Sequence, residues 1–148
     1  MRATVIADAS FCSTTKAAGW AVWVAYDGGA KEKRSGVFRD RPPNSGIAEL
    51  QAALNGIWLA YQHGARDILI QTDCESVVHA IKGANNAYGA LWRDARDKYF
   101  PQAVIRARHV RGHTRVQDSR SWCNRWADAE AKRHMRAQRE ELIGVDAS

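Results

Sequence analysis

Four acidic residues of this chain, Asp8, Glu49, Asp73 and Asp128, occupy positions from which carboxylates can converge. Asp8 and Asp73 each follow a short apolar run that is typical of a buried strand, whereas Glu49 and Asp128 lie in stretches with helical periodicity. Each acid alone has an ordinary structural interpretation. Asp73 could cap a helix that starts at Cys74, and Asp128 could be a surface acid among arginines. It is the joint placement of the four that indicates a site.

Converging carboxylates repel one another and titrate as a coupled set, so such a cluster needs a cation to neutralise it. Oxygen ligands without His or Cys favour a hard ion, Mg²⁺ or Mn²⁺. Four carboxylates suffice for two ions that share one bridging carboxylate. Two ions about 3.5–4 Å apart can activate a water molecule and stabilise the leaving oxygen of a phosphodiester. The acids therefore predict a metal-dependent phosphodiester hydrolase.

The elements that must position these acids follow from the hydrophobic pattern. Strands are expected at residues 3–11, 17–26, 31–39, 68–73 and 103–110, and helices at residues 45–63, 74–82, 88–100 and 122–140. This order predicts an α/β fold: a five-stranded mixed sheet, in which three antiparallel strands are followed by parallel additions, with helices on both faces. Asp8 and Asp73 would then end neighbouring strands, at the sheet edge where ligands of such folds bind.

The helix that carries Glu49 is the best defined of these elements. Ser45 is its expected N-cap, and His63-Gly64 is its expected end. The residues at helical spacing that should form its buried stripe are Ile47, Leu50, Leu54, Ile57, Trp58 and Tyr61. Glu49 lies on the flank of this stripe, so the first turn should hold it near the edge of the sheet.

Composition and charge limit the class of protein. The chain has 148 residues, so we expect one domain over residues 1–140 and a frayed tail at residues 141–148. The formal net charge is +6, and the window from Arg106 to Arg139 alone holds ten Lys or Arg against three acids. This imbalance favours a polyanionic partner, although an ordinary solvated basic face is an equally good interpretation of the charge alone.

The three cysteines, Cys12, Cys74 and Cys123, have no paired spacing and form no zinc-ligand pattern. No apolar run reaches transmembrane length, and the first residues lack the apolar region of a signal peptide. We therefore expect a soluble, monomeric protein of the cytoplasm that has no membrane partner.

Five pieces of the sequence together resemble type 1 ribonuclease H. They are Ile6-Ala7-Asp8-Ala9-Ser10, Ile47-Ala48-Glu49-Leu50-Gln51-Ala52, Gln71-Thr72-Asp73-Cys74-Glu75-Ser76, Val110-Arg111-Gly112-His113 and Asn124-Arg125-Trp126-Ala127-Asp128. Their order and spacing match the family from residue 4 to about residue 137. The resemblance implies a ribonuclease H-like fold and an endoribonuclease that cleaves the RNA strand of RNA·DNA hybrids, leaving 5′-phosphate and 3′-hydroxyl ends.

The resemblance also implies roles for individual residues. Asp8 would bridge two Mg²⁺ ions, Glu49 and Asp73 would complete one metal site, and Asp128 would complete the other. His113 matches the residue that assists proton transfer or product departure.

The substrate contacts that the resemblance implies are carried by small polar groups. Asn124 matches a position that steadies the last helix near the site, and Thr14, Asn44 and Ser45 fall where the family contacts substrate sugar and phosphate. Recognition of the RNA 2′-hydroxyl would fall to groups near Ser10, Asn44 and Glu75.

The chain also departs from the family pattern. Ala9 follows Asp8 where the family usually has Gly, and Ser45-Gly46 replaces an Asn-Asn pair that is common before the helical Glu. Only residues 83–87 separate two expected helices, so the basic helical protrusion of many family members should be missing. We therefore expect weaker hybrid binding or a different footprint, with the basic residues of the Arg106–Arg139 window acting from another side.

Several alternatives stay open. The chain could be another nuclease of the same fold, such as a resolvase or an exonuclease, or a nucleic-acid-binding module that has lost catalysis. It could also be a protein of another class whose acids are structural and bind no Mg²⁺. Its start at Met1 and its short tail favour a free-standing enzyme over a domain of a reverse transcriptase.

Overall fold

The computed structural model of the protein describes residues 1–110 and 119–147. Within them lie five strands and four helices: β1 (Arg2–Phe11), β2 (Ala18–Tyr26), β3 (Lys31–Val37), α1 (Ser45–Gln62), β4 (Asp67–Thr72), α2 (Glu75–Ile81), α3 (Ala87–Tyr99), β5 (Val104–His109) and α4 (Ser119–Ala147). Among the described residues, no helix has the length and apolar character that crossing a bilayer requires.

The strands form one mixed sheet in the order β3-β2-β1-β4-β5. β2 pairs antiparallel with both β1 and β3, whereas β4 pairs parallel with both β1 and β5. Gly28 and Gly29 turn the chain between β2 and β3 with φ values of +92° and +98°, which glycine adopts without strain. The predicted fold class, strand directions and hairpin are confirmed.

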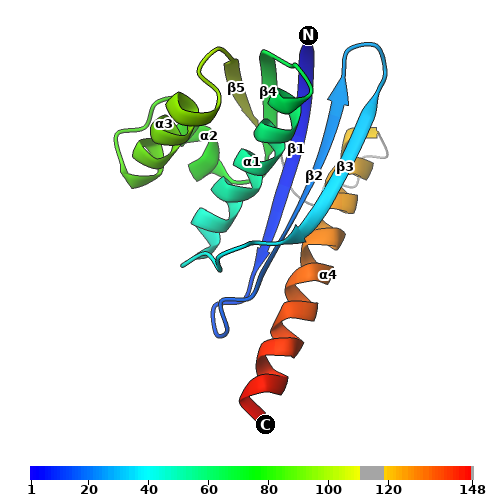
Figure 1. The fold of residues 1–148 in the computed structure, drawn as a ribbon, viewed down its shortest axis with the longest axis vertical. Helices are drawn as coiled ribbons and strands as arrows, with labels where there is room; N and C mark the ends of the chain where they lie inside the picture. Colours follow the sequence, from blue (N-terminus) through cyan, green and yellow to red (C-terminus); the bar gives the residue numbers. More distant parts are fainter. Residues whose placement is uncertain (111–118, 148) are drawn as a thin grey trace.

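Helices cover both faces of the sheet (Figure 1). α1, α2 and α3 lie on one face, and α4 lies alone on the other. The α1 side holds the larger hydrophobic core, to which β1, β2, β4 and all three helices contribute. The α4 side holds a smaller cluster of buried residues: Ile6, Ala21, Trp23, Cys123, Ala127 and Ala131. Because side chains alternate along β1, its two faces serve two different cores.

The buried face of α1 differs from the predicted stripe. Leu50 and Ile57 are buried as expected, but Trp58 is 49% exposed. The helix contacts the sheet mainly through small residues: Ala48, Ala52, Ala53, Gly56 and Ala60. They let the helix axis approach the strands closely, which turns the larger Leu54 and Trp58 side chains away from the sheet. The prediction that Trp58 belongs to the core is therefore wrong.

The N-cap of α1 is Asn44 and not Ser45. The Asn44 side-chain oxygen accepts a hydrogen bond from Ile47 N at 2.8 Å, and Ser45 is already the first helical residue. At the other end His63 is the C-cap, and Gly64 follows with a φ of +95°, as the sequence predicted.

Helix α4 is longer than the sequence predicted. It begins at Ser119 and continues as helix to Ala147, past the expected end near Glu140. Its last turns extend beyond the end of the sheet (Figure 1). Gln138 binds it to the start of β2, because its side-chain oxygen accepts a hydrogen bond from Ala18 N at 2.8 Å.

Candidate active site

Asp8 lies inside β1 and not at its end, because the strand continues to Phe11. The neighbouring strand β4 ends earlier, at Thr72, so Asp8 is level with the point where β4 stops. Along β1 it has the same parity as Ile6, which packs on α4, so it belongs to the face that α4 covers. Asp8 is only 9% exposed, and Ala9 N donates to its Oδ1 at 2.9 Å.

Asp73 directly follows β4. The last paired residues of β1 and β4 are Ile6 and Gln71, so Asp8 and Asp73 each lie two residues beyond the same rung of the ladder. The backbone around Asp73 is held on both sides: Cys74 N donates to Thr72 Oγ1 at 3.1 Å, and His109 Nε2 donates to the backbone oxygen of Asp73 at 3.2 Å. Asp73 itself is exposed.

Glu49 comes from the opposite face of the sheet. It follows the capped first turn of α1, and the packing of that helix on β1 carries it to the edge where β4 ends. One carboxylate oxygen each of Asp8, Glu49 and Asp73 lies within 4.8 Å of the other two. We call these three residues the carboxylate trio.

The raised pKa values of Asp8 and Glu49 show that bringing the three carboxylates together is electrostatically unfavourable. Burial, followed by the charges of Asp73 and Asp128, raises the pKa of Asp8 to about 7. Burial also raises the pKa of Glu49 to about 10, with further contributions from the charges of Asp8 and Asp73 and from a hydrogen bond to Asp8. In the absence of a cation, Glu49 is therefore protonated at neutral pH.

A metal ion fits this donor set. Glu49 Oε2 is buried, and no group of the described part of the chain hydrogen-bonds to it. A buried carboxylate oxygen without a partner is costly, and a cation at the trio would supply that partner. The donors are all carboxylate oxygens, which suits Mg²⁺ or Mn²⁺.

Asp128 lies beside the trio but outside it. It is on α4, next to Ala127, which is buried against the α4 face of the sheet. Its charge contributes to the raised pKa of Asp8. Its Oδ2 accepts from Lys132 Nζ at 3.0 Å, so this acid already has a cationic partner within its own helix.

The other predicted site residues are dispersed around this edge. His113 lies outside the described residues. Thr14 is exposed in the turn between β1 and β2, and Asn44, Ser45 and Glu75 are exposed at the starts of α1 and α2. Two half-buried residues complete the set: Ser10 on β1 and Asn124 on α4.

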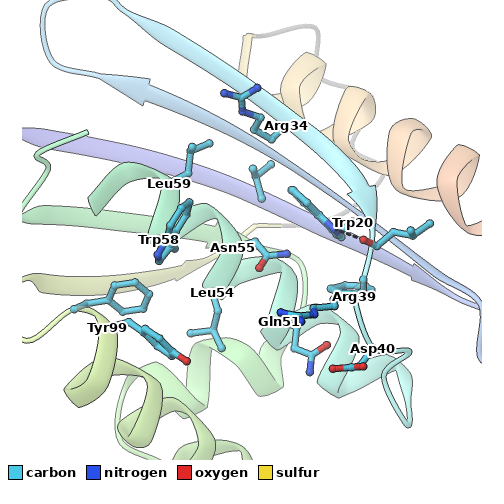
Figure 2. Close-up of a pocket in the computed structure, with 14 residues that line it drawn as sticks. Trp20, Arg34, Arg39, Asp40, Gln51, Leu54, Asn55, Trp58, Leu59 and Tyr99 are labelled. Carbon is cyan, nitrogen blue, oxygen red and sulfur yellow. Dashed lines mark hydrogen bonds between the residues drawn. The ribbon is translucent and has the colours of Figure 1, made fainter. Parts of the chain in front are cut away.

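A pocket in the described part of the protein lies away from the trio (Figure 2). It has a volume of about 660 Å³ and lies beside α1, where Trp58 and Leu54 face Trp20 of β2 and Tyr99 of α3. None of the trio, nor Asp128, lines it. The trio instead lies where β4 ends, outside this pocket.

A model of the reverse transcriptase-like family matches residues 7–99, which include all three residues of the trio. The chain belongs to this family. Its fold is the ribonuclease H-like fold. No curated protein sequence matches the chain.

Solved structures agree with the family assignment. The N-terminal RNase H domain of a Mycobacterium tuberculosis protein has a TM-score of 0.69 and 19% identity, covering 95% of this chain and 97% of that domain. RNase H1 of the archaeon Halobacterium salinarum has a TM-score of 0.70 and 16% identity, covering 93% and 99%. LC11-RNase H1, solved in complex with an RNA/DNA hybrid, has a TM-score of 0.67 and 14% identity, covering 92% and 98%. At these identities the likeness establishes the fold.

Two residues of this reverse transcriptase-like protein touch the site without having been predicted. Lys132 binds Asp128, and His109 binds the backbone of Asp73. Lys132 follows Asp128 by one helical turn, so the i to i+4 rule could have found it. His109 could not have been found in this way, because its contact depends on the pairing of β5 with β4.

The short connection between α2 and α3 is present as predicted. α2 ends at Ile81 and α3 begins at Ala87, so no helical protrusion lies between them. The basic window of the sequence is instead divided by the fold. Arg106 and Arg108 lie on the edge strand β5, and the rest of its described basic residues lie on α4.

Proposed function

We propose that this protein is an endoribonuclease that hydrolyses the RNA strand of RNA·DNA hybrids. The observation that supports it best is the carboxylate trio, which lies where β4 ends beside β1 in a ribonuclease H-like sheet. Its buried Glu49 Oε2 has no hydrogen-bond partner among the described residues. The complex of LC11-RNase H1 with an RNA/DNA hybrid supports the substrate class.

Asp8, Glu49 and Asp73 would hold one divalent ion, and Asp8 and Asp128 a second. When bound, such a pair of ions lowers the pKa of an attacking water and stabilises the leaving oxygen. The water forms a bond to phosphorus while the bond from phosphorus to the 3′-oxygen breaks. The products would be a 5′-phosphate and, after that oxygen takes up a proton, a 3′-hydroxyl, with His113 assisting the proton transfer.

The chain's own residues would also orient the hybrid. Asn44 uses its side-chain oxygen to cap α1, which leaves its NH₂ group as a donor for substrate sugar or phosphate. Ser10 follows Asp8 by two residues, and Glu75 follows Asp73 by two residues. These two side chains are the candidates for binding the 2′-hydroxyl, the group that distinguishes RNA from DNA. Exposed Arg108, Arg125 and Arg136 would attract the phosphate backbone. With three free cysteines, we place this activity in the reducing cytoplasm.

The deciding experiment is cleavage of one end-labelled RNA strand presented alone, in an RNA duplex and in an RNA·DNA hybrid, with Mg²⁺ or with EDTA. We expect cutting only in the hybrid with Mg²⁺. Asp8→Asn should abolish cutting while circular dichroism shows an unchanged fold. Asp27→Asn is the matched control, because Asp27 lies in the exposed β2–β3 turn at the other end of the sheet.

Other results would support the alternatives. Cleavage of duplex DNA or of branched junctions would identify another nuclease of the same fold. Hybrid binding without cutting would identify an inactive binding module. Normal cutting by Asp8→Asn would refute the metal assignment.

A further inference from the structure

Lys132 occupies a special place among the basic residues of α4. Its Nζ lies 3.0 Å from Asp128 Oδ2, and the two residues are one helical turn apart. Asp128 would otherwise add a further negative charge to an edge where carboxylate oxygens of Asp8, Glu49 and Asp73 already lie within 4.8 Å of one another. Among the described residues, Lys132 is thus the cation paired with the acid proposed for the second ion.

We propose that Lys132 is the resident counter-ion of Asp128, whose ammonium group must leave this carboxylate before a divalent ion can bind there. The inference rests on the proposed function and deepens it, because it concerns the second of the two metal positions. Lys132 acts through Asp128 and is a positioning residue, not a catalytic one.

The pair is suited to exchange with an ion. The Lys132 side chain is 41% exposed and that of Asp128 is 33% exposed, so the ammonium group can move into solvent without being buried elsewhere. Lysine carries its charge at the end of a flexible stem and binds a carboxylate as a point charge, which a divalent ion can outcompete. Exposed pairs of this kind are weak, so Lys132 would hinder the ion and not exclude it.

The consequence is an unequal pair of metal positions. At the trio, an ion replaces the proton that Glu49 holds at neutral pH and gains Glu49 Oε2, which has no hydrogen-bond partner among the described residues. At Asp128 an ion must first displace Lys132. The two positions therefore differ in what an ion must displace, and the charge of Lys132 should weaken binding at Asp128 without affecting the trio.

The test is a titration of the protein with Mn²⁺ or Mg²⁺ in the absence of nucleic acid. Binding is measured by calorimetry and by the rise in melting temperature. The variant is Lys132→Met, which keeps the aliphatic stem and removes the charge. The matched control is Lys31→Met. Lys31 of β3 pairs with Ala25 of β2, which pairs with Thr4 of β1. Because Thr4 is four residues before Asp8 on β1, Lys31 lies well away from the level of the site. Lys132→Arg, which keeps a cation, guards against an effect of repacking.

We expect Lys132→Met to lower the half-saturating ion concentration of the position at Asp128 roughly two- to fivefold, the range that an exposed ion pair is worth. The position at the trio should not change, and Lys31→Met and Lys132→Arg should not bind the ions more tightly than the wild type. Unchanged or weaker binding by Lys132→Met would overturn the inference while leaving the metal centre intact. Absence of ion binding by the wild type would refute the metal centre itself, and the inference with it.

Discussion

Gly19 of β2 lies directly against the backbone of Ala131 of α4. A β carbon at residue 19 would overlap the Ala131 carbonyl oxygen and would lie 2.7 Å from Met135 N. The absence of a side chain at this one position lets α4 approach the sheet, and α4 is the helix that brings Asp128 toward Asp8.

Gly19→Ala should therefore destabilise the protein by about 1–3 kcal/mol, the usual cost of overpacking a close contact. The two nearest atoms belong to the backbone of α4 and the third is the Cβ of His134, so none can move aside as the end of a flexible side chain would. Gly36→Ala on β3 is the control, because its β carbon would meet nothing closer than Trp20 at 3.6 Å. Urea unfolding of both variants checks the prediction, and equal stabilities would contradict it.

The cap of α1 offers a second test. Asn44→Ala should cost about 1 kcal/mol, because it leaves Ile47 N without its 2.8 Å partner at the helix start. Ser45→Ala should change the free energy of unfolding by less than about 0.5 kcal/mol, since an exposed first residue makes no such bond. If Ser45→Ala were the more harmful of the two, the cap would be Ser45 as the sequence suggested.

Two tryptophans should differ strongly in their contribution to stability. Trp92 is 2% exposed and belongs to the larger core, whereas Trp58 is half exposed beside the pocket of Figure 2. Trp92→Ala should cost about 3–5 kcal/mol, and Trp58→Ala should cost well under half of that. Thermal unfolding of the two variants, followed by circular dichroism, measures the difference. A similar loss for both would place Trp58 in the core after all.

The metal-free protein should become less stable as pH rises. The folded protein raises the pKa of Asp8 from its ordinary 3.8 to about 7 and that of Glu49 from 4.5 to about 10. Folding therefore binds protons, and the stability that they confer is lost between pH 4 and 7 for Asp8 and between pH 4.5 and 10 for Glu49. Added Mg²⁺ should raise the melting temperature more at pH 8 than at pH 5.

Glu49→Gln identifies the group responsible. In EDTA at pH 8 it should be more stable than the wild type, because Glu49 must take up a proton on folding at this pH and the amide of Gln need not. Near pH 4 the two proteins should converge. Glu140→Gln, a change at an exposed position of α4, should follow the wild type throughout. A wild type whose stability was independent of pH from 5 to 9 would argue against the buried, coupled trio.

The sequence by itself determined the fold class and most of the element boundaries. Apolar runs, the Asp27-Gly28-Gly29 turn and helical periodicity are local signals. A mixed sheet covered by helices is the simplest way to bury the apolar residues of these elements. The same local signals marked Asp8 and Asp73 as acids that follow apolar runs and Glu49 as an acid near the start of a helix, although β1 continues past Asp8 to Phe11. Their convergence then followed from the parallel pairing of β1 with β4.

Only the tertiary structure decided which side chains are buried and which charges are paired. Trp58 has the hydrophobicity of a core residue, but the small residues of α1 contact the sheet and leave it exposed. Glu130 of α4 is paired with a residue remote in sequence, because Ser35 of β3 donates to it at 3.1 Å, and Arg133 donates to it at 2.8 Å. Burial and pairing depend on the distance between elements that are remote in sequence. Packing sets that distance, and the hydrophobic periodicity of one element carries no information about it.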